Sequence, residues 1–234
     1  TGEVGQAESK PSAAYDTTSN RIVVAYKDDS NSDYGTVLVG TVSSGSISFG
    51  TAVVFASAYS AFMGVAYDSN ANRTVIVYSD AQSDGNAIVG TVDPSDNSIS
   101  FGSPAEYNGT GVSTQAITFD STANKVVIVY KGDSQHGHII VGTVNSSNNS
   151  ISFGADNEWQ TAQTNNVDVN YDVNANKSVI TYVDAANSDK GAARVATVSG
   201  TSISLGSEVI FHDATTSRVV SIFDFYLVSI IRTV

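Results

Sequence analysis

The stretch GVAYDSNANRTVIVYSDAQSDGNAIVGTVDPSDNSISFGSPAEY, residues 64–107, decides the fold because its apolar residues recur with the period of a β-strand. The run GVAYD alternates and ends at the turn-rich SNAN, and TVIVY follows as a continuous β-branched and aromatic strand. A polar loop, SDAQSDGN, leads to AIVGTV, and DPSDN then turns the chain into SISFG and its extension to Tyr107. This pattern predicts four antiparallel strands joined by tight turns, with no helix.

The same unit recurs along the chain at a fixed step of 52 residues. An aromatic residue followed by Asp marks every copy, at Tyr15-Asp16, Tyr67-Asp68, Phe119-Asp120, Tyr171-Asp172 and Phe223-Asp224. The same step joins a second set of aromatic side chains, Phe55, Tyr107, Trp159 and Phe211. Four antiparallel strands in a repeat of about 40–50 residues are typical of a propeller blade. The sequence therefore predicts one all-β propeller domain over residues 1–234, with four full blades at about 13–64, 65–116, 117–168 and 169–220 and the start of a fifth at 221–234.

Composition and charge exclude several classes of protein. The 234 residues include 11 Lys and Arg against 23 Asp and Glu, a formal net charge of −12, and there is no Cys. Without Cys there are no disulfides, zinc–thiolate sites, iron–sulfur sites or thiol nucleophiles. So acidic a chain has no basic patch to neutralise phosphates, and nucleic acid is therefore not an expected partner. No apolar run reaches the roughly 20 residues of a membrane helix, so membrane insertion is not expected either.

Three phrases of the repeat resemble a known one: YDSNANRTVIVY at 67–78, TVLVGTVSSGSISFG at 36–50 and NAIVGTVDPSDNSISFG at 86–102. They resemble the VGTV–SISFG tandem repeat of proteins encoded by marine phages and uncultured viruses, over residues 13 to about 224. The resemblance implies a β-propeller and a virus-related or extracellular structural setting, hence a location outside the cell or on the virion surface. It supplies no catalytic residues. The chain departs from this repeat after Asp224, where FYLV replaces the expected polar turn.

The acidic side chains have structural interpretations. The Asp at each strand end, such as Asp16, is interpreted as a turn residue that accepts backbone N–H bonds, and the alternative is a carboxylate ring that binds a cation. Asp29, Asn31 and Asp33 alternate as calcium ligands do, but their loop lacks the Gly and the Glu of an EF-hand. We therefore interpret this segment as a solvated hairpin loop and keep a calcium site as the alternative.

Catalytic motifs are absent from the sequence. His136 and His138 have a spacing compatible with a metal pair, but no third ligand is apparent. There is no nucleophile elbow, phosphate loop or dinucleotide fingerprint. We predict a protein that is not an enzyme and that needs no cofactor, with calcium as the one exception considered.

The connections after the fourth strand combine equal length with little shared composition. They read ASAYSAFMG at 56–64, NGTGVSTQA at 108–116, QTAQTNNVD at 160–168 and HDATTSRVV at 212–220. All are expected on one rim of the propeller, where binding residues often lie. The side chains suited to a sugar or peptide are Tyr59, Phe62, Gln115, Gln160, Gln163, Asn165 and Asn166. The alternative is drift in exposed loops, and the recurring second set of aromatics is interpreted as packing between blades rather than as sugar platforms.

The C-terminal segment SIFDFYLVSIIRTV, residues 221–234, is too apolar to be left in water. We expect a strand that pairs either with the first blade, which closes the ring, or with a neighbouring subunit, which builds a fibre; a truncated or altered end is the third reading. The residues of this assembly strand are Ile222, Phe223, Phe225, Tyr226, Leu227, Val228, Ile230 and Ile231.

These observations favour a non-catalytic structural or attachment protein of a virion or extracellular assembly, with one loop rim that binds a surface or glycan. The first alternative is a self-assembling fibre subunit linked by its C-terminal strand. The second is an enzyme on a propeller, which would need titratable residues gathered around the axis. The expected partners are other copies of the chain and a cell-surface glycan.

Overall fold

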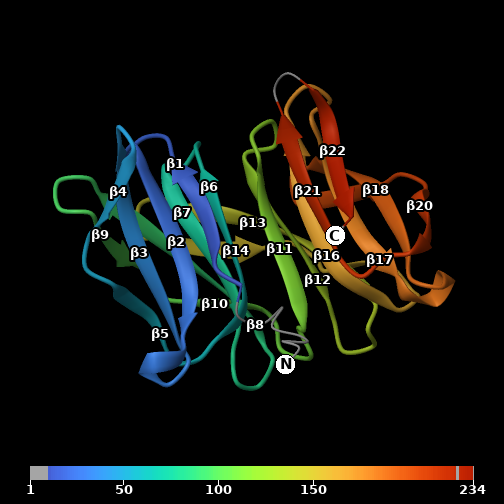
Figure 1. Cartoon of the computed structure of the whole chain (residues 1–234), viewed down its shortest axis with the longest axis horizontal. Coiled ribbons are helices and arrows are strands. Elements are labelled where there is room, and N and C mark those ends of the chain that lie inside the picture. Colours follow the sequence, from blue (N-terminus) through green and yellow to red (C-terminus); the bar gives the residue numbers. More distant parts are fainter. Residues whose placement is uncertain (1–9, 225–226, 234) are drawn as a thin grey trace. The chain divides into compact units, whose positions relative to one another are not determined.

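The computed structural model describes residues 10–224 and 227–233, and strands make up almost all of its regular structure (Figure 1). Two short 3₁₀ turns, η2 (Asp29–Asn31) and η3 (Ala185–Asn187), are the helical elements of this described part. None of its helices is long and apolar enough to cross a bilayer. The period-two pattern of the sequence therefore predicted the secondary-structure class correctly.

Strands β1 to β20 form four antiparallel sheets of five strands, which we call blades 1 to 4 (Figure 1). The last two strands, described below, form a separate two-stranded sheet. Blade 1 contains β1 (Ser12–Asp16), β2 (Arg21–Asp28), β3 (Tyr34–Ser43), β4 (Ser46–Phe49) and β5 (Val53–Tyr59). Blade 2 contains β6 (Ala61–Asp68), β7 (Arg73–Ser79), β8 (Gly85–Asp93), β9 (Ser98–Phe101) and β10 (Ala105–Asn108). Blade 3 contains β11 (Thr114–Asp120), β12 (Lys125–Lys131), β13 (Gly137–Asn145), β14 (Ser150–Phe153) and β15 (Asn157–Gln160). Blade 4 contains β16 (Thr164–Asp172), β17 (Lys177–Asp184), β18 (Lys190–Ser199), β19 (Ser202–Leu205) and β20 (Val209–Thr215).

The predicted fourth strand of each blade consists of two segments, and both pair with the third strand. In blade 2, β9 ends at Phe101 and β10 begins at Ala105, and both lie along β8. The chain steps from one segment to the other at Gly102, whose N–H donates to the carbonyl of Val89 at 3.0 Å. A Cβ at Gly102 would lie 2.1 Å from the carbonyl oxygen of Asn149, so only glycine fits this close approach.

The contacts between residues divide the chain into two compact units. Unit 1 comprises residues 1–110 and 144–152, and unit 2 comprises residues 111–143 and 153–234. The division does not follow the blade boundaries, because the turn between β13 and β14 belongs to unit 1. A single domain over the whole chain stays a prediction.

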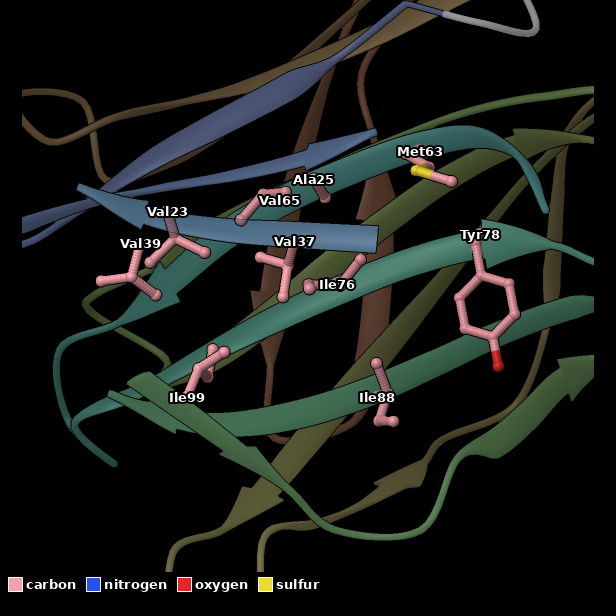
Figure 2. Close-up of a cluster of buried hydrophobic side chains, with 10 residues drawn as sticks. All are labelled: Val23, Ala25, Val37, Val39, Met63, Val65, Ile76, Tyr78, Ile88 and Ile99. Atoms are coloured by element: carbon pink, nitrogen blue, oxygen red, sulfur yellow. The ribbon is translucent and has the colours of Figure 1, made fainter. Parts of the chain in front are cut away.

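The core of unit 1 lies between blades 1 and 2 (Figure 2). We call the face of blade 2 that carries Ile76 and Tyr78 its leading face and the opposite face its trailing face, and we use both names at the equivalent positions of the other blades. The trailing side chains of blade 1 are Val23, Ala25, Val37 and Val39, and the leading side chains of blade 2 are Met63, Val65, Ile76, Tyr78, Ile88 and Ile99. Because Val75 and Val77 on the trailing face of blade 2 are also fully buried, TVIVY is buried on both faces, as its continuous apolar run indicates.

In unit 1, the Arg that begins the second strand of each blade bonds to a turn of the following repeat. Arg21 Nε donates to Asn97 Oδ1 at 2.5 Å, and Arg73 Nε donates to Asn149 Oδ1 at 2.6 Å. One terminal nitrogen of each Arg also donates to a carbonyl of the same turn at 2.5 Å. Arg and Asn are 76 residues apart in both pairs, and the second pair lies one repeat step of 52 residues after the first.

Unit 2 repeats this packing between blades 3 and 4. The cluster joins Val127, Val129, Ile139 and Trp159 of blade 3 to Val167, Val169, Ile180, Tyr182, Ala192 and Ala196 of blade 4. The first group again belongs to a trailing face and the second to a leading face. Blade-to-blade packing is therefore the source of apolar burial in both units.

The C-terminal segment forms a hairpin, in which β21 (Val219–Asp224) pairs antiparallel with β22 (Leu227–Thr233). In the described part of the chain the partner of β22 is β21, so the segment contains two strands. Pairing of the tail with the first blade or with a neighbouring subunit stays a prediction. The hairpin forms because two β-branched runs follow each other in the sequence, as at the start of every repeat. Of the predicted assembly residues, Ile222 and Phe223 lie on β21, Leu227, Val228, Ile230 and Ile231 lie on β22, and Phe225 and Tyr226 lie outside the described residues.

Side chains of blade 4 hold this hairpin in the place of a fifth blade. Ser221 donates through its N–H to Asp168 Oδ2 at 2.6 Å and through its hydroxyl to the same oxygen at 3.0 Å. Asn170 Nδ2 donates to the carbonyl of Ser221 at 2.5 Å. Blades 1 and 2 make the equivalent contact, where the N–H of Val65 donates to Ser12 Oγ at 3.0 Å. In both places the first strand of one blade thus bonds to the first strand that follows it in the series, at corresponding repeat positions.

Candidate functional site

The repeated aspartates are turn residues, as the sequence indicates. Oδ1 of Asp16, Asp68, Asp120 and Asp172 accepts the backbone N–H groups two and three residues further on, at 2.8–2.9 Å for seven of these bonds and 3.0 Å for the eighth. Asp16, Asp68 and Asp120 are at most 4% exposed. The carboxylate therefore closes the turn between the first two strands, and the alternative of a cation-binding ring at Asp16, Asp68, Asp120 and Asp172 is not supported.

The loop considered for calcium carries its own cation. Lys27 Nζ lies 3.3 Å from Asp29 Oδ1 and 3.3 Å from Asp33 Oδ1, and the same ammonium lies 5.4 Å from the ring centre of Tyr59. Residues 29–31, Asn31 included, form η2, and Asp28 caps it by accepting the N–H of the residue two further on at 3.1 Å. Nowhere in the described residues do three or more His, Cys, Asp or Glu side chains come together as a metal site. The geometry thus speaks against calcium at Asp29 and Asp33, because an ammonium occupies the space between their carboxylates.

The two histidines each pair with a carboxylate in blade 3. His138 Nδ1 lies 2.8 Å from Asp156 Oδ2, and His136 Nδ1 lies 2.5 Å from Glu158 Oε1. Tyr130 donates its hydroxyl to Asp156 Oδ1 at 2.7 Å, and its ring stacks on His138 with centroids 5.2 Å apart. The sequence pointed to the histidines but not to their partners, because the pairing of β15 with β13 brings Glu158, and Asp156 just before β15, beside them.

These contacts shift the pKa values of His138 and Asp156 in opposite directions. The hydrogen bond to Asp156 raises the pKa of His138 above its usual value, against the effect of burial, and the charges of Asp156, Glu158 and Asp133 add to the increase. Burial alone would raise the pKa of Asp156, but the hydrogen bonds from His138 and Tyr130 outweigh it and lower this pKa. The pair is therefore ionised on both sides over a range of mildly acidic pH.

This pair predicts a pH-dependent stability that a His138→Gln variant should lose. A raised His pKa stabilises the fold below about pH 6.5, and the contribution disappears as the pH rises through the folded value. Because the pKa of Asp156 is lowered, its ionised form stabilises the fold above about pH 3.9, and this contribution is lost as the pH falls through the folded value. We expect the difference in free energy of unfolding between wild type and His138→Gln to be about 1 kcal/mol at pH 6 and to fall toward pH 8.5. Urea unfolding across this range measures it, and a difference that grows with pH would contradict the sign.

A second polar network lies between blades 3 and 4. Tyr182 donates its hydroxyl to Glu208 Oε2, and Gln160 Nε2 donates to the same carboxylate oxygen at 3.1 Å. Arg194 Nη2 lies 3.8 Å from that oxygen. Burial, reinforced by the bond to Glu208, raises the pKa of Tyr182, which is fully buried. The phenol therefore stays protonated and out of reach of a ligand, and Gln160 serves the blade junction rather than the rim.

In unit 1 the predicted rim residues lie beside the loop of Lys27. The connection between β5 and β6 is bonded to the one between β2 and β3, since the N–H of Ser60 donates to the carbonyl of Asp33 at 3.0 Å. Phe62 has a φ of 50° at a bulge in β6, a conformation that bulky residues rarely adopt. Strained backbone conformations of this kind are frequent at functional sites, so Phe62 stays a candidate binding residue.

In unit 2 the rim gathers amide side chains from two connections. The N–H of Thr164 donates to the carbonyl of Gln135 at 2.9 Å and ties the connection after β15 to the one after β12. Gln163 Nε2 donates to Gln135 Oε1 at 2.7 Å, and Lys131 Nζ donates to Asn165 Oδ1 at 3.1 Å. Gln135 and Gln163 are exposed. We call Lys131, Gln135, Gln163 and Asn165 the amide rim.

The remaining predicted rim residues are placed differently. Gln115 is 8% exposed on β11 and lies opposite Tyr130, so it belongs to the blade interior. Asn166 has a φ of 48° at a bulge in β16 and donates to the carbonyl of Ser217 at 2.9 Å. Sequence reasoning missed Lys131 and Gln135. Their position was a signal: Lys131 precedes the loop after the second strand and Gln135 lies within it, and this loop shares the rim with the loop after the fourth strand.

The recurring aromatics pack between blades, as the sequence indicates. The ring of Phe55 meets that of Tyr78 edge-on at 5.3 Å between centroids, and the ring of Trp159 meets that of Tyr182 at 4.6 Å. Each aromatic also covers a glycine of its own blade. A Cβ added to this glycine would lie 2.4–2.6 Å from the ring in each of the pairs Gly35–Phe55, Gly85–Tyr107, Gly137–Trp159 and Gly191–Phe211. Tyr107 and Trp159 are buried and therefore closed off from ligands, whereas Phe55 and Phe211 are half-buried.

No protein-family model and no curated protein sequence matches the chain. Among solved structures, it is similar to the NanB sialidase from Streptococcus pneumoniae with a TM-score of 0.55 and 12% identity, over 74% of this chain and 27% of that one. It is also similar to the Hadza microbial sialidase Hz136 with a TM-score of 0.54 and 10% identity, over 88% and 47% of the two chains. At these identities the similarity shows the fold alone, and it confirms an all-β propeller built from repeated antiparallel sheets. The chain spans less than half the length of either sialidase.

Proposed function

We propose that this chain is a non-catalytic carbohydrate-binding propeller whose amide rim in unit 2 contacts a glycan. The observation that carries the proposal is the pairing of Gln163 with Gln135 and of Asn165 with Lys131 at one exposed edge. Planar amides offer both donors and acceptors, which is what the hydroxyl groups of a sugar require. Lys131 and Asn165 lie on strands, and the backbone bond from Thr164 to Gln135 fixes the two connections that carry Gln135 and Gln163 to each other.

The fold of the chain supports the same ligand class. Both similar structures carry the name sialidase, and sialidases are glycoside hydrolases. Their similarity to this chain is limited to the fold, so it supports a glycan as ligand only as an analogy. The resemblance to viral repeats extends the proposal to attachment of a virion or an extracellular assembly to a glycan-bearing surface.

The carboxylates Asp156 and Glu208, each bonded to a tyrosine hydroxyl, support binding without hydrolysis. Glycoside hydrolysis uses a pair of carboxyl groups, or a tyrosine nucleophile, that reach the sugar. Tyr182 is fully buried and bonded to Glu208, and Asp156 is bonded to both Tyr130 and His138. These groups are committed to holding strands together.

A double variant of the amide rim tests the proposal. Gln135→Ala with Gln163→Ala removes the two exposed amides, and we expect glycan affinity to fall about 10-fold, since each lost hydrogen bond is worth about 0.5–1.5 kcal/mol. A glycan array identifies the ligand for wild type, and biolayer interferometry with that glycan measures the loss. Asn174→Ala, in the exposed turn between β16 and β17, is the matched control and should bind as wild type does.

Two outcomes would overturn the proposal. One is wild-type protein that binds no glycan on the array. The other is a rim variant that binds with unchanged affinity while its thermal unfolding matches that of wild type. Release of sugar from the bound glycan would show an enzyme and would refute the non-catalytic part.

A further inference from the structure

The leading face of blade 1 is exposed although the same face is covered elsewhere. Its apolar side chains Val42, Ile47 and Phe49 are 56%, 49% and 47% exposed, and Tyr15 is 51% exposed. In blade 2 the equivalent of Ile47 is Ile99, which is 6% exposed. The difference cannot come from composition, because the SISF segment is identical in the two blades.

The internal junctions show what covers a leading face. In unit 1 the leading face of blade 2 packs on the trailing face of blade 1, and Val92 and Phe101 join that cluster. In unit 2 the leading face of blade 4 packs on the trailing face of blade 3, with Val198 and Leu205 at the equivalent places. A leading face of this composition is therefore complementary to a trailing face of the same repeat.

An exposed trailing face lies at the other end of the series. On β21, Val220 and Ile222 alternate with Val219 and Ser221, so the first two share the face that points away from blade 4. Val220 is 49% exposed and Ile222 is 57% exposed, whereas Val219 and Ser221 are buried. Blade 1 therefore exposes a leading apolar face, and the β21–β22 hairpin exposes a trailing one.

We propose that the leading face of blade 1 binds the trailing face of the β21–β22 hairpin of a second copy of this chain. Such a contact continues the blade-to-blade packing across two molecules. It is heterologous, so it builds rings where the rotation closes and filaments where it does not. This contact differs from donation of the C-terminal strand to a neighbouring subunit, because β21 and β22 stay paired with each other in each chain.

The repeat predicts which residues meet in this contact. Ser12 bonds to the N–H of Val65, 53 residues on, and Asp168 bonds to the N–H of Ser221, again 53 residues on. Val220 stands at the repeat position of Asp168, and the corresponding partner in a second chain is Ala13, which is exposed on β1. The Arg-to-Asn bond of the internal junctions is missing, because Gly45 of blade 1 stands where Asn97 accepts it in blade 2. The contact is therefore apolar and should depend on concentration.

Single cysteines test this geometry cleanly, because the chain has none of its own. Ala13→Cys chains and Val220→Cys chains carry different affinity tags, are mixed and are oxidised. We expect the mixed disulfide dimer to form at least 5-fold more than a dimer of Ala13→Cys with Val209→Cys, a matched control at another exposed valine on β20. Equal yields for Val220→Cys and Val209→Cys would overturn the proposal.

Sedimentation velocity gives an independent measurement. Wild type should gain mass with concentration, and Ile47→Lys should remove this gain while Val209→Lys keeps it, with both variants unfolding at the wild-type temperature. An internal disulfide in a chain that carries both Ala13→Cys and Val220→Cys would show closure within one molecule and would refute the second copy. A variant without residues 1–9 that associates when the full chain does not would show that this segment covers the face, and it would refute the proposal equally.

Discussion

Replacing Trp159 by alanine should lower the free energy of unfolding by about 3–5 kcal/mol, because the change removes a large buried side chain and leaves a cavity. Trp159 is 4% exposed, and its ring meets Tyr182 of blade 4 edge-on at 4.6 Å between centroids. Its Nε1 donates to the carbonyl of His138 at 2.9 Å, and its ring covers Gly137. One residue thus joins two strands of its own blade and the face of the next.

Urea unfolding followed by far-UV circular dichroism measures this loss, since Trp159 is the only Trp and fluorescence disappears with it. Trp159→Phe is the matched control, because blades 1 and 4 carry Phe55 and Phe211 at this position. We expect Trp159→Phe to retain most of the stability that Trp159→Ala loses. A loss below about 1 kcal/mol for Trp159→Ala would contradict packing of this ring between blades.

The repeat made the blade architecture predictable from sequence. A step of 52 residues aligns every buried strand, and the turn role of Asp16 and the packing role of Trp159 followed from their return in each copy. The glycine beneath each aromatic was missed, because a residue without a side chain adds nothing to a hydrophobic pattern. The break in the fourth strand at Gly102 was missed for the same reason.

The candidate site was less predictable because it lies where the copies differ. His136 and His138 stood out by type, but their partners lie on β15 or directly before it. Glu158 is on β15, Asp156 precedes it, and the pairing of β15 with β13 depends on the break near Gly154. Sequence spacing placed Asp29 and Asp33 in one loop but did not show that Lys27 lies close to both carboxylates. The C-terminal hairpin was misassigned because a single apolar segment was taken as one strand.

Replacing Asp120 by alanine should cost about 2–4 kcal/mol of stability, the second largest effect expected of a single side chain. Its Oδ1 accepts the N–H groups of Thr122 at 3.0 Å and of Ala123 at 2.8 Å, and the side chain is 2% exposed. Hydrogen bonds to a charged group contribute about 1.5–3 kcal/mol each, and a buried donor left without an acceptor loses its water as well. The turn between β11 and β12 therefore depends on this carboxylate. An exposed Asp that accepts the same kind of backbone bond contributes less, because water can take its place.

Asp93→Ala isolates the effect of burial, because Asp93 Oδ1 accepts the N–H of Ser95 at 2.8 Å in an exposed turn. Water replaces the carboxylate there, so we expect a much smaller change in the urea midpoint than for Asp120→Ala. Asp120→Asn keeps an oxygen in place and should fall between the two. If Asp120→Ala and Asp93→Ala shift the midpoint equally, the repeated aspartate is not the element that closes the blade turn, and its return at every 52nd residue needs a functional explanation after all.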